Sequence, residues 1–211
     1  MKVALELDTR SKLLEAAVKV FAREGFVGSS VRQIAETAGV NHGSIKYHYS
    51  SKNELWRATV AYLYQSMEAA VFKNETQWET MSPREQLIDH IDAYVRFNCS
   101  RPEYLRIVLY ESIALSERYE WLADNYLRPF TDRAINRVAL AQEQGLFRAD
   151  IPALNLYHMN MAASRSMLFV APELASRYGV DVYSEIEIER HVDALVKLFI
   201  VPEKESVPSG P

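Results

Sequence analysis

Residues 42–48 concentrate side chains that can donate hydrogen bonds. The segment reads HGSIKYH, and its donors are the imidazole, hydroxyl and ammonium groups of His42, Ser44, Lys46, Tyr47 and His48. Such groups bind phosphate oxygens and the edges of DNA bases. The segment is too polar for a core helix and too aromatic for an ordinary solvent-facing helix. This composition favours a DNA-binding surface, and the alternative is a helix that only packs against its neighbours.

Two short helices joined by a tight turn are expected to position these donors. Ser30 caps the first helix, and Gln33 three residues later completes a capping-box pattern. Gly39 allows a sharp turn, after which Asn41 caps the second helix. Inward-facing apolar side chains would hold the pair at a fixed angle: Ile34, Ala35, Ala38, Val40, Ile45 and Tyr49. This pattern indicates a helix-turn-helix unit, whose second helix enters the DNA major groove in known cases.

An amphipathic helix is expected before this pair, and further helices fill the rest of the chain. The first spans residues 9–24 and ends at Gly25, a residue type common at helix C-termini. Further helical patterns cover residues 52–74, 83–99, 102–116, 118–144, 152–170 and 184–200. We find no strand-like alternation. The sequence therefore predicts an all-α protein of about nine helices.

The charge balance differs between the two ends of the chain. The whole chain has a net charge of −4, from 24 basic and 28 acidic residues. Residues 1–55 hold eight Lys/Arg and six Asp/Glu, a net of +2, so the remainder has a net of −6. A mildly basic head on an acidic body is compatible with local contact to DNA.

Metal, redox and enzymatic chemistry find little support in the sequence. The five histidines, at positions 42, 48, 90, 158 and 191, lack ligand spacing, so no metal or cofactor is expected. We see neither a phosphate-cradling glycine-rich loop nor a nucleophile motif, and we do not expect an enzyme. The single cysteine, Cys99, fits a reducing cytoplasm and is expected to be a small buried residue. Neither a signal peptide nor a membrane span is predicted.

One gap-free stretch, residues 9–55, carries many positions of a known pattern. It reads TRSKLLEAAVKVFAREGFVGSSVRQIAETAGVNHGSIKYHYSSKNEL. The matching positions are Ala16-Ala17, Phe21, Gly25-Phe26, Ser29-Ser30, Ile34-Ala35, Ala38-Gly39-Val40, Gly43, His48-Tyr49 and Lys52. The stretch resembles the N-terminal domain of TetR-family transcriptional regulators, and beyond Leu55 the resemblance is architectural. It implies a homodimeric, ligand-responsive DNA-binding protein, usually a repressor.

The resemblance also implies roles for individual residues. It implies that Ser30 and Lys52 contact phosphates and that Arg32 reaches a base. The implied exposed positions of the recognition helix are His42, Gly43, Ser44, Lys46, Tyr47 and His48. Relatives usually carry tyrosine where this chain has Lys46, and here the aromatic residue follows as Tyr47. Lys46 can donate to a phosphate or to guanine O6 and N7, so both roles remain open.

The body of the chain, residues 56–202, is rich in aromatic residues. Core packing is the simplest interpretation, and the alternative is a pocket for a small apolar or aromatic effector. Asn98 and Arg165 interrupt apolar helical faces, and a buried polar group needs a partner. Together with Tyr104 and Tyr126 they are the candidate ligand-binding residues. The partner of each could equally be another side chain.

The last two expected helices, residues 152–170 and 184–200, present broad apolar faces. In the resembled family these helices pair with their symmetry mates in a four-helix interface. Burial within one chain is the alternative, and both can hold at once. A two-fold homodimer also suits the palindromic sites that helix-turn-helix proteins bind.

These patterns predict two domains and one function. Residues 1–55 are the expected three-helix DNA-binding domain, residues 56–202 a larger helical ligand-binding and dimerisation domain, and residues 203–211 a disordered tail. The expected function is a cytoplasmic, sequence-specific repressor that a small molecule releases from a palindromic double-stranded operator. The alternatives are a ligand-independent DNA-binding protein and a helical protein-interaction module.

Overall fold

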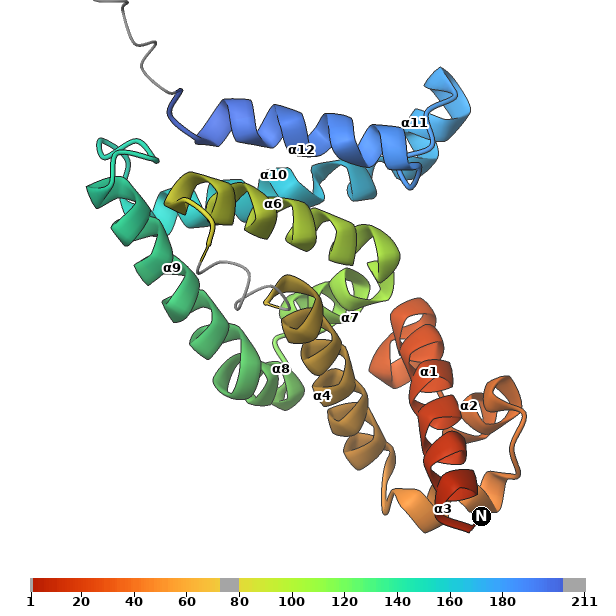
Figure 1. Cartoon of the computed structure of the whole chain (residues 1–211). Helices are drawn as coiled ribbons and strands as arrows, with labels where there is room; N and C mark the ends of the chain where they lie inside the picture. Colours follow the sequence, from red (N-terminus) through yellow and green to blue (C-terminus); the bar gives the residue numbers. More distant parts are fainter. Residues whose placement is uncertain (1, 73–79, 203–211) are drawn as a thin grey trace, which may run out of the picture. The chain divides into compact units, whose positions relative to one another are not determined.

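The computed structural model of the chain describes residues 2–72 and 80–202, and the tail expected at residues 203–211 lies outside them. In this part of the chain the elements are α1 (Lys2–Gly28), α2 (Val31–Ala38), α3 (His42–His48), α4 (Lys52–Val71), α6 (Pro83–Ser100), α7 (Pro102–Ala114), α8 (Glu117–Leu122), the π-helical turn η1 (Ala123–Leu127), α9 (Arg128–Glu143), α10 (Ala153–Phe169), α11 (Ala171–Tyr178) and α12 (Glu185–Phe199) (Figure 1). Extended pairing among these residues is limited to one isolated bridge between Phe147 and Ile200. The predicted all-α class is confirmed.

The single helix predicted over residues 118–144 is wrong, because the structure divides it into three pieces. α8 ends at Leu122, η1 follows, and α9 begins at Arg128. Pro129 gives the physical reason, since it lacks the N–H that a continuous α-helix would donate four residues back. A single π turn accommodates the missing bond. The periodicity also fails to indicate α11, a short helix that ends at Gly179 with φ of 67°.

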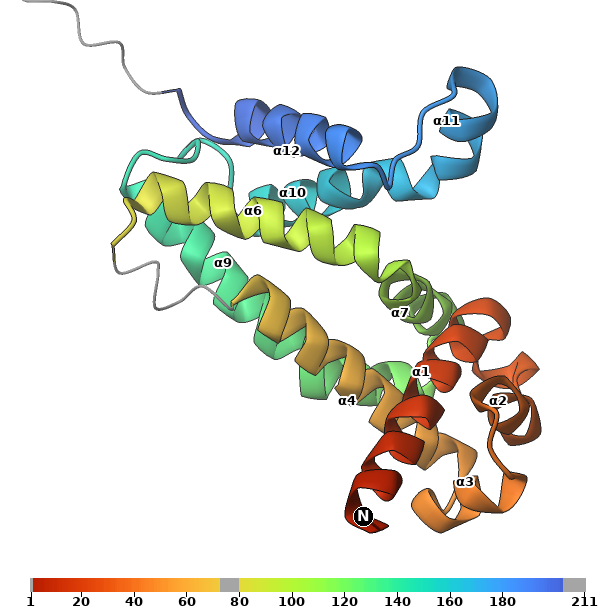
Figure 2. The ribbon, with the colours of Figure 1, turned by 45° about the vertical axis from the view of Figure 1, so that its right-hand side comes forward.

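The chain packs as two units, and unit 1 contains the predicted DNA-binding segment. It comprises the residues up to Ala70 together with Arg101–Leu127. In unit 1, α1 packs on α2 and α7, and α2 packs on α3 (Figure 2). Its fully buried large side chains include Leu13, Phe21, Ile34, Leu55, Trp56 and Leu63. Residues 9–55 therefore share one core with residues 56–70 and 101–127.

Gly25, where the sequence predicts the end of the first helix, interrupts α1, which continues to Gly28. Its φ of 67° and ψ of 178° are non-helical, in a region that other residue types adopt only with strain. Phe26 follows directly; its ring stacks on Phe21, with centroids 6.1 Å apart, and meets Trp56 edge-on at 6.4 Å. The break in the helix thus delivers Phe26 to the aromatic part of the unit 1 core.

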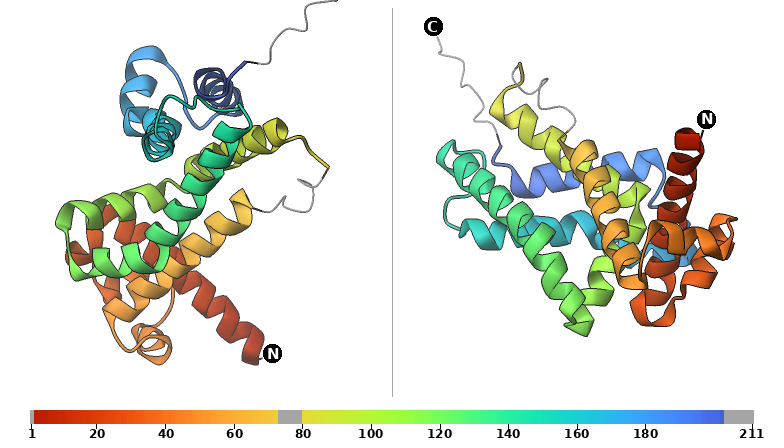
Figure 3. Two further views of the ribbon diagram at one scale, coloured as in Figure 1. Left: turned by 90° about the vertical axis from the view of Figure 1, so that its left-hand side faces the viewer. Right: turned by 90° about the horizontal axis from the view of Figure 1, so that it is seen from below.

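Unit 2 is built from α6, α9, α10, α11 and α12, and its described residues are 71–72, 80–100 and 128–202. α10 packs on α6, α9 and α12, and α12 also packs on α6. Figure 3 shows these helices from two further sides. Their shared core includes Ile91, Val95, Leu156, Ile188, Val192 and Leu195. The two C-terminal helices that the sequence predicts correspond to α10 and α12. Each of them contributes one face to this core.

Candidate functional site

α2 and the turn after it form as their sequence predicts. The Oγ of Ser30 accepts a hydrogen bond from the backbone N–H of Gln33 at 3.1 Å, which caps the start of α2. Gly39 ends the helix with φ of 66° and ψ of 31°. This left-handed conformation is easiest for glycine, because it has no Cβ. The reversal between the two helices therefore depends on one residue type at one position.

α3 is capped by Asn41, whose Oδ1 accepts a hydrogen bond from the backbone N–H of Gly43 at 2.8 Å. The buried face of the helix consists of Ile45, 2% exposed, and its C-cap Tyr49, 4% exposed. A Cβ added to Gly43 would lie 3.3 Å from Asn41 Oδ1, tighter than ordinary contact. Glycine at this position therefore keeps the cap intact and leaves the first turn of α3 without a side chain there.

The opposite face of α3 presents Gly43, Lys46 and Tyr47 to solvent, at the i, i+3, i+4 spacing that places residues on one side of a helix. The Tyr47 side chain is 73% exposed, an unusual state for an aromatic residue inside a helix. His48 is half-buried, and its ring lies edge-on to Tyr47 with centroids 5.0 Å apart. The backbone of His42 and Ser44 belongs to α3, but their side chains lie outside the described part of the structure.

Ser30 and Arg32 lie at the start of α2. Ser30 is exposed, and its hydroxyl uses an acceptor lone pair for the cap, which leaves the O–H as a donor. Arg32 pairs with Glu36 at 2.9 Å, and its side chain is 83% exposed. Exposed pairs of this kind contribute little to stability. Arg32 can therefore exchange this carboxylate for another acceptor at small cost.

Lys52, predicted to contact phosphate, is engaged within unit 1. Its Nζ donates to the backbone carbonyl of Ser29 and lies 4.5 Å from the centroid of the Phe26 ring. The guanidinium of Arg118 lies 3.9 Å from the same centroid, and Arg118 is paired with the buried Glu111 at 3.1 Å. Burial, followed by the nearby Arg118, lowers the pKa of the Lys52 ammonium. Lys52 therefore fixes the start of α4 to the residues that lead into α2.

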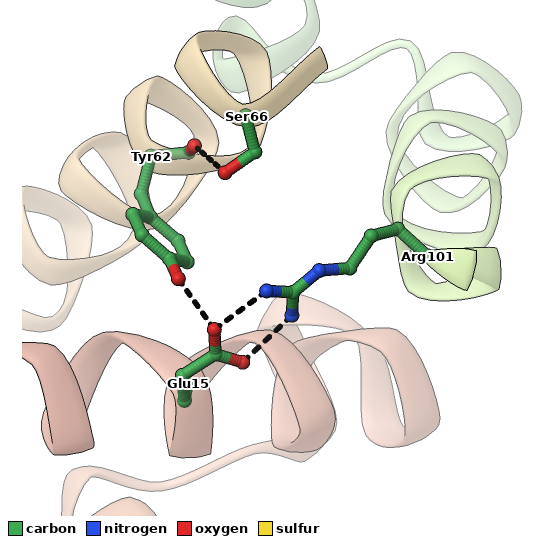
Figure 4. A network of polar contacts seen from close by, with 4 residues as sticks. All are labelled: Glu15, Tyr62, Ser66 and Arg101. Carbon is green, nitrogen blue, oxygen red and sulfur yellow. Dashed lines mark hydrogen bonds and ion pairs between the residues drawn. The ribbon is translucent and has the colours of Figure 1, made fainter. Parts of the chain in front are cut away.

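A second polar network joins α1, α4 and the residue before α7. Both Nη atoms of Arg101 bind the Glu15 carboxylate at 2.8 Å, and the hydroxyl of Tyr62 donates to the same carboxylate (Figure 4). The hydrogen bonds from Arg101 lower the pKa of the Glu15 carboxyl, although partial burial opposes them. Ser66, one turn after Tyr62, bonds to the Tyr62 carbonyl at 2.9 Å. The network ties three separate parts of unit 1 together.

Unit 2 encloses a cavity of about 300 Å³ between α6, α9 and α10. Apolar side chains form most of its wall, among them Phe130, Phe147 and Leu156. The polar side chains that line it are Gln86, His90, Arg137, Gln144, Tyr157 and Asn160. Sequence reasoning missed this set, because each helix contributes only one or two of its members. The i, i+4 pair Gln86 and His90 beside apolar neighbours was the signal available.

The comparisons with known proteins agree with this geometry. Residues 13–59 match the family described as "Bacterial regulatory proteins, tetR family". Residues 83–198, more than half of the chain, match "Tetracyclin repressor-like, C-terminal domain". The chain belongs to the TetR family. Membership identifies this protein as a DNA-binding transcriptional regulator, and neither match indicates catalytic activity.

Individual relatives of this TetR-family protein support the assignment. It is 31% identical over 159 residues to the HTH-type transcriptional repressor NicS of Pseudomonas putida, covering 72% of this chain and 71% of NicS. The ketosteroid transcriptional regulator KstR2 of Mycobacterium tuberculosis has the same fold, with a TM-score of 0.71, 20% identity, and coverage of 92% and 95%. AibR, solved with isovaleryl coenzyme A and operator DNA, gives a TM-score of 0.67 at 17% identity, with coverage of 92% and 99%.

The four candidate ligand-binding residues of this TetR-family protein are divided between the units. In unit 1, the Tyr104 hydroxyl donates to that of Tyr64 at 3.1 Å, and the Tyr126 ring stacks on Tyr64 at 4.6 Å. In unit 2, Asn98 is buried and donates to the Tyr94 carbonyl at 2.8 Å, while Arg165 donates to the Tyr94 hydroxyl. None of the four lines the described cavity.

Cys99 of the TetR-family chain is buried, as predicted, and burial raises the pKa of its thiol. Over residues 2–72 and 80–202, no cluster of three or more His, Cys, Asp or Glu side chains could hold a metal ion. In the same ranges, every helix is too short or too polar to cross a membrane.

Proposed function

We propose that this protein is a repressor that binds a palindromic operator as a homodimer and is released by a small molecule bound in unit 2. The observation that carries the proposal is the division of α3 into two faces. Ile45 and Tyr49 anchor one face in the core, while Gly43, Lys46 and Tyr47 stand exposed on the other. A short helix fixed in this way is suited to the major groove. NicS, a relative, is itself named a repressor.

The proposed DNA contacts fall into two chemical groups. Ser30, through its spare hydroxyl proton, and Lys52, if it releases the Ser29 carbonyl, donate to phosphates, which set the register of the protein on the duplex. Arg32 and α3 face the bases, with Gly43 permitting close approach. Lys46 and Tyr47 dominate the exposed face of α3, with His48 beside them, and we expect His42 and Ser44 to contribute from its first turn. Direct readout by these side chains would set the operator sequence.

We assign dimerisation to α10 and α12. Each helix buries one face in the unit 2 core, yet large apolar side chains remain exposed on their other faces: Leu154, Met159, Phe169, Ile186 and Leu198. Apolar area of this kind is what a homodimer interface covers. A two-fold dimer would present two α3 helices to successive major grooves.

The proposed mechanism is a shift between two populations of the dimer. A small effector in the unit 2 cavity stabilises dimers in which the two α3 helices are wrongly spaced for successive grooves, so operator affinity falls. AibR, which was solved with both isovaleryl coenzyme A and operator DNA, supports a regulator of this general kind. The protein would act in the cytoplasm, where the operator DNA is located.

The salt dependence of DNA binding tests the proposal against the alternatives. A regulator loses operator affinity as salt rises, and Lys46→Ala weakens binding further. No binding by the unmodified chain would instead support a protein-interaction module. Binding to a palindrome that no small molecule in the cavity affects would support a ligand-independent DNA-binding protein. Lys46 is a cleaner position than Lys52, because removing Lys52 also removes its contacts with Ser29 and Phe26.

A further inference from the structure

The unit 2 cavity has a mostly apolar wall, and the described polar side chains that line it include no carboxylate. Among the described residues that line it, none is Asp or Glu, and Arg137 is its only lysine or arginine. Arg137 comes from α9, His90 from α6 and Asn160 from α10. The wall therefore offers one permanent positive charge and several hydrogen-bond donors, with no carboxylate to neutralise a cationic guest.

Asn160 supplies the most specific observation. Its Nδ2 is buried and has no hydrogen-bond partner within the described structure. A buried donor left without an acceptor costs roughly 1–3 kcal/mol, and most such groups in proteins are satisfied. Because Asn160 lines the cavity, an acceptor on a bound ligand would remove this cost.

His90 adds a hydrogen-bond donor to the cavity wall without adding a charge. Burial and, after it, the nearby Arg137 lower the pKa of the His90 imidazole to about 4, and Asp89 acts in the opposite direction. The imidazole is therefore neutral near pH 7 and can donate one hydrogen bond. Arg137 remains the charged group of the wall, and its guanidinium matches a carboxylate in shape and charge.

We propose that the cavity binds a small organic acid, with its carboxylate held by Arg137 and the Asn160 amide and its apolar body against Phe130, Phe147 and Leu156. The inference rests on the proposed function, since it names the chemical class of the effector. A cavity of about 300 Å³ is at the lower end of ligand sites and suits a single ring or a short branched chain. A neutral or cationic molecule of the same shape lacks the negative charge that the Arg137 guanidinium attracts.

Calorimetric titration of the full chain with matched probes tests this class directly. The probes are benzoate, phenylacetate and cyclohexanecarboxylate, each compared with its amide and its amine. We expect at least one acid to bind with its amide about tenfold weaker or more, because a hydrogen bond to a charged group contributes about 1.5–3 kcal/mol. The amines should not bind. Failure of all three acids to bind overturns the inference, as does equal affinity for an acid and its amide.

Two variants locate the contacts. Arg137→Gln removes the charge, and Asn160→Leu replaces the unpartnered amide with an apolar group of similar size. Both should weaken the acid about tenfold or more, and Asn160→Leu should leave the thermal midpoint unchanged or higher. Arg133→Gln is the matched control, because Arg133 lies on the same helix and near the same Phe72 ring but does not line the cavity. Unchanged acid affinity in Arg137→Gln or Asn160→Leu contradicts the proposal.

The titrations contain no DNA, so their result is separate from the regulatory proposal. If an acid binds as expected but leaves operator affinity unchanged at fixed salt, the ligand class stands and effector control of DNA binding fails. If no acid binds but the operator is a palindrome, the DNA-binding function stands and the ligand class fails.

Discussion

Both Nη atoms of Arg101 donate hydrogen bonds to the Glu15 carboxylate at 2.8 Å, although the two residues are 86 positions apart in the chain. Tyr62 donates to the same carboxylate from α4. Paired geometry of this kind is the strongest that an ion pair adopts, and here it connects the first helix of the DNA-binding segment to the residue that precedes α7. The helix that supports the helix-turn-helix is thus held by residues from a distant part of the sequence.

Replacing Arg101 should therefore loosen unit 1. Arg101→Gln removes the two parallel bonds to Glu15 and should lower the free energy of unfolding by about 1–2 kcal/mol, since partial exposure screens the pair. Urea denaturation at low salt measures this change. Arg106→Gln, at an exposed position on α7, is the control and should alter stability by less than about 0.5 kcal/mol. Equal stability of the two variants would show that the pair contributes nothing.

The turn between α2 and α3 depends on glycine at position 39. Gly39→Ala places a Cβ at φ of 66° and should cost about 1–2 kcal/mol of stability, even though nothing lies within 4 Å to clash with it. Thermal unfolding measures the loss. Gly28→Ala is the control, because Gly28 lacks a positive φ and its added Cβ would make an ordinary 3.6 Å contact with Glu24. A similar loss in both variants would mean that backbone conformation is not the cause.

Lys46→Ala should weaken binding to a selected operator by about 1–3 kcal/mol. The salt dependence of affinity then separates the two roles left open for Lys46. A phosphate contact lowers the slope by about one and weakens all sequences alike, whereas a guanine contact relaxes specificity at one base pair. Lys19→Ala, exposed on α1, is the control and should bind as the unmodified chain does. Unchanged affinity in Lys46→Ala would remove Lys46 from the interface.

The parts of the structure that the sequence predicted are those with local causes. Caps at Ser30 and Asn41, and the left-handed Gly39, are each determined within a few residues, so a pattern reveals them. The bond between Arg101 and Glu15 has no such signature, because many arginines and carboxylates could have met. The π turn before Pro129 results from the balance between one lost hydrogen bond and continued packing, which composition does not reveal.

The cavity could not be predicted from the sequence, for a related reason. Its polar wall is assembled from one or two residues on each of three helices and from Gln144 just after α9, and none of those residues is unusual alone. Asn98 and Arg165 did interrupt apolar faces, as the sequence indicated, but both bond to Tyr94. The pattern showed that these two polar side chains would need partners and could not show which partners. As a result, none of the candidate ligand-binding residues coincides with the cavity wall.

Stability should fall with acid in a window set by His90. The pKa of the His90 imidazole is about 4 in the folded chain, whereas that of an ordinary histidine is 6.5, so the unfolded chain takes up a proton first. Stability is complete above pH 6.5 and decreases as the pH falls toward 4, by at most about 3 kcal/mol. Because the pKa of the Glu15 carboxyl is lowered, its contribution to stability is lost only below the ordinary carboxyl pKa of 4.5.

Urea midpoints measured between about pH 5 and 7 isolate this effect, since few carboxylates titrate there. His90→Gln should flatten the profile, whereas His158→Gln, at an exposed position on α10, should leave it unchanged. A profile that is equally steep in His90→Gln would assign the acid sensitivity to another group.

The exposed apolar faces of α10 and α12 predict the effect of a charge there. Leu198 is 70% exposed on α12, and Leu198→Glu should shift the chain from dimer to monomer at micromolar concentration. Sedimentation velocity measures the shift, and operator affinity should fall about tenfold or more with it. Ile113→Glu, 80% exposed in unit 1, is the control and should remain dimeric. A dimeric Leu198→Glu protein would place the interface elsewhere.

Selection of bound sequences from random duplex DNA by the full chain addresses the DNA-reading role of α3 as part of a two-fold dimer. We predict enrichment of a palindrome whose half-site centres are about one helical turn, 10–10.5 base pairs, or a multiple of it, apart. The base preferences should change when the selection is repeated with Lys46→Ala and Tyr47→Ala. Enrichment of no sequence, or of a non-palindromic sequence that is unaffected by these two variants, would contradict the role assigned to α3.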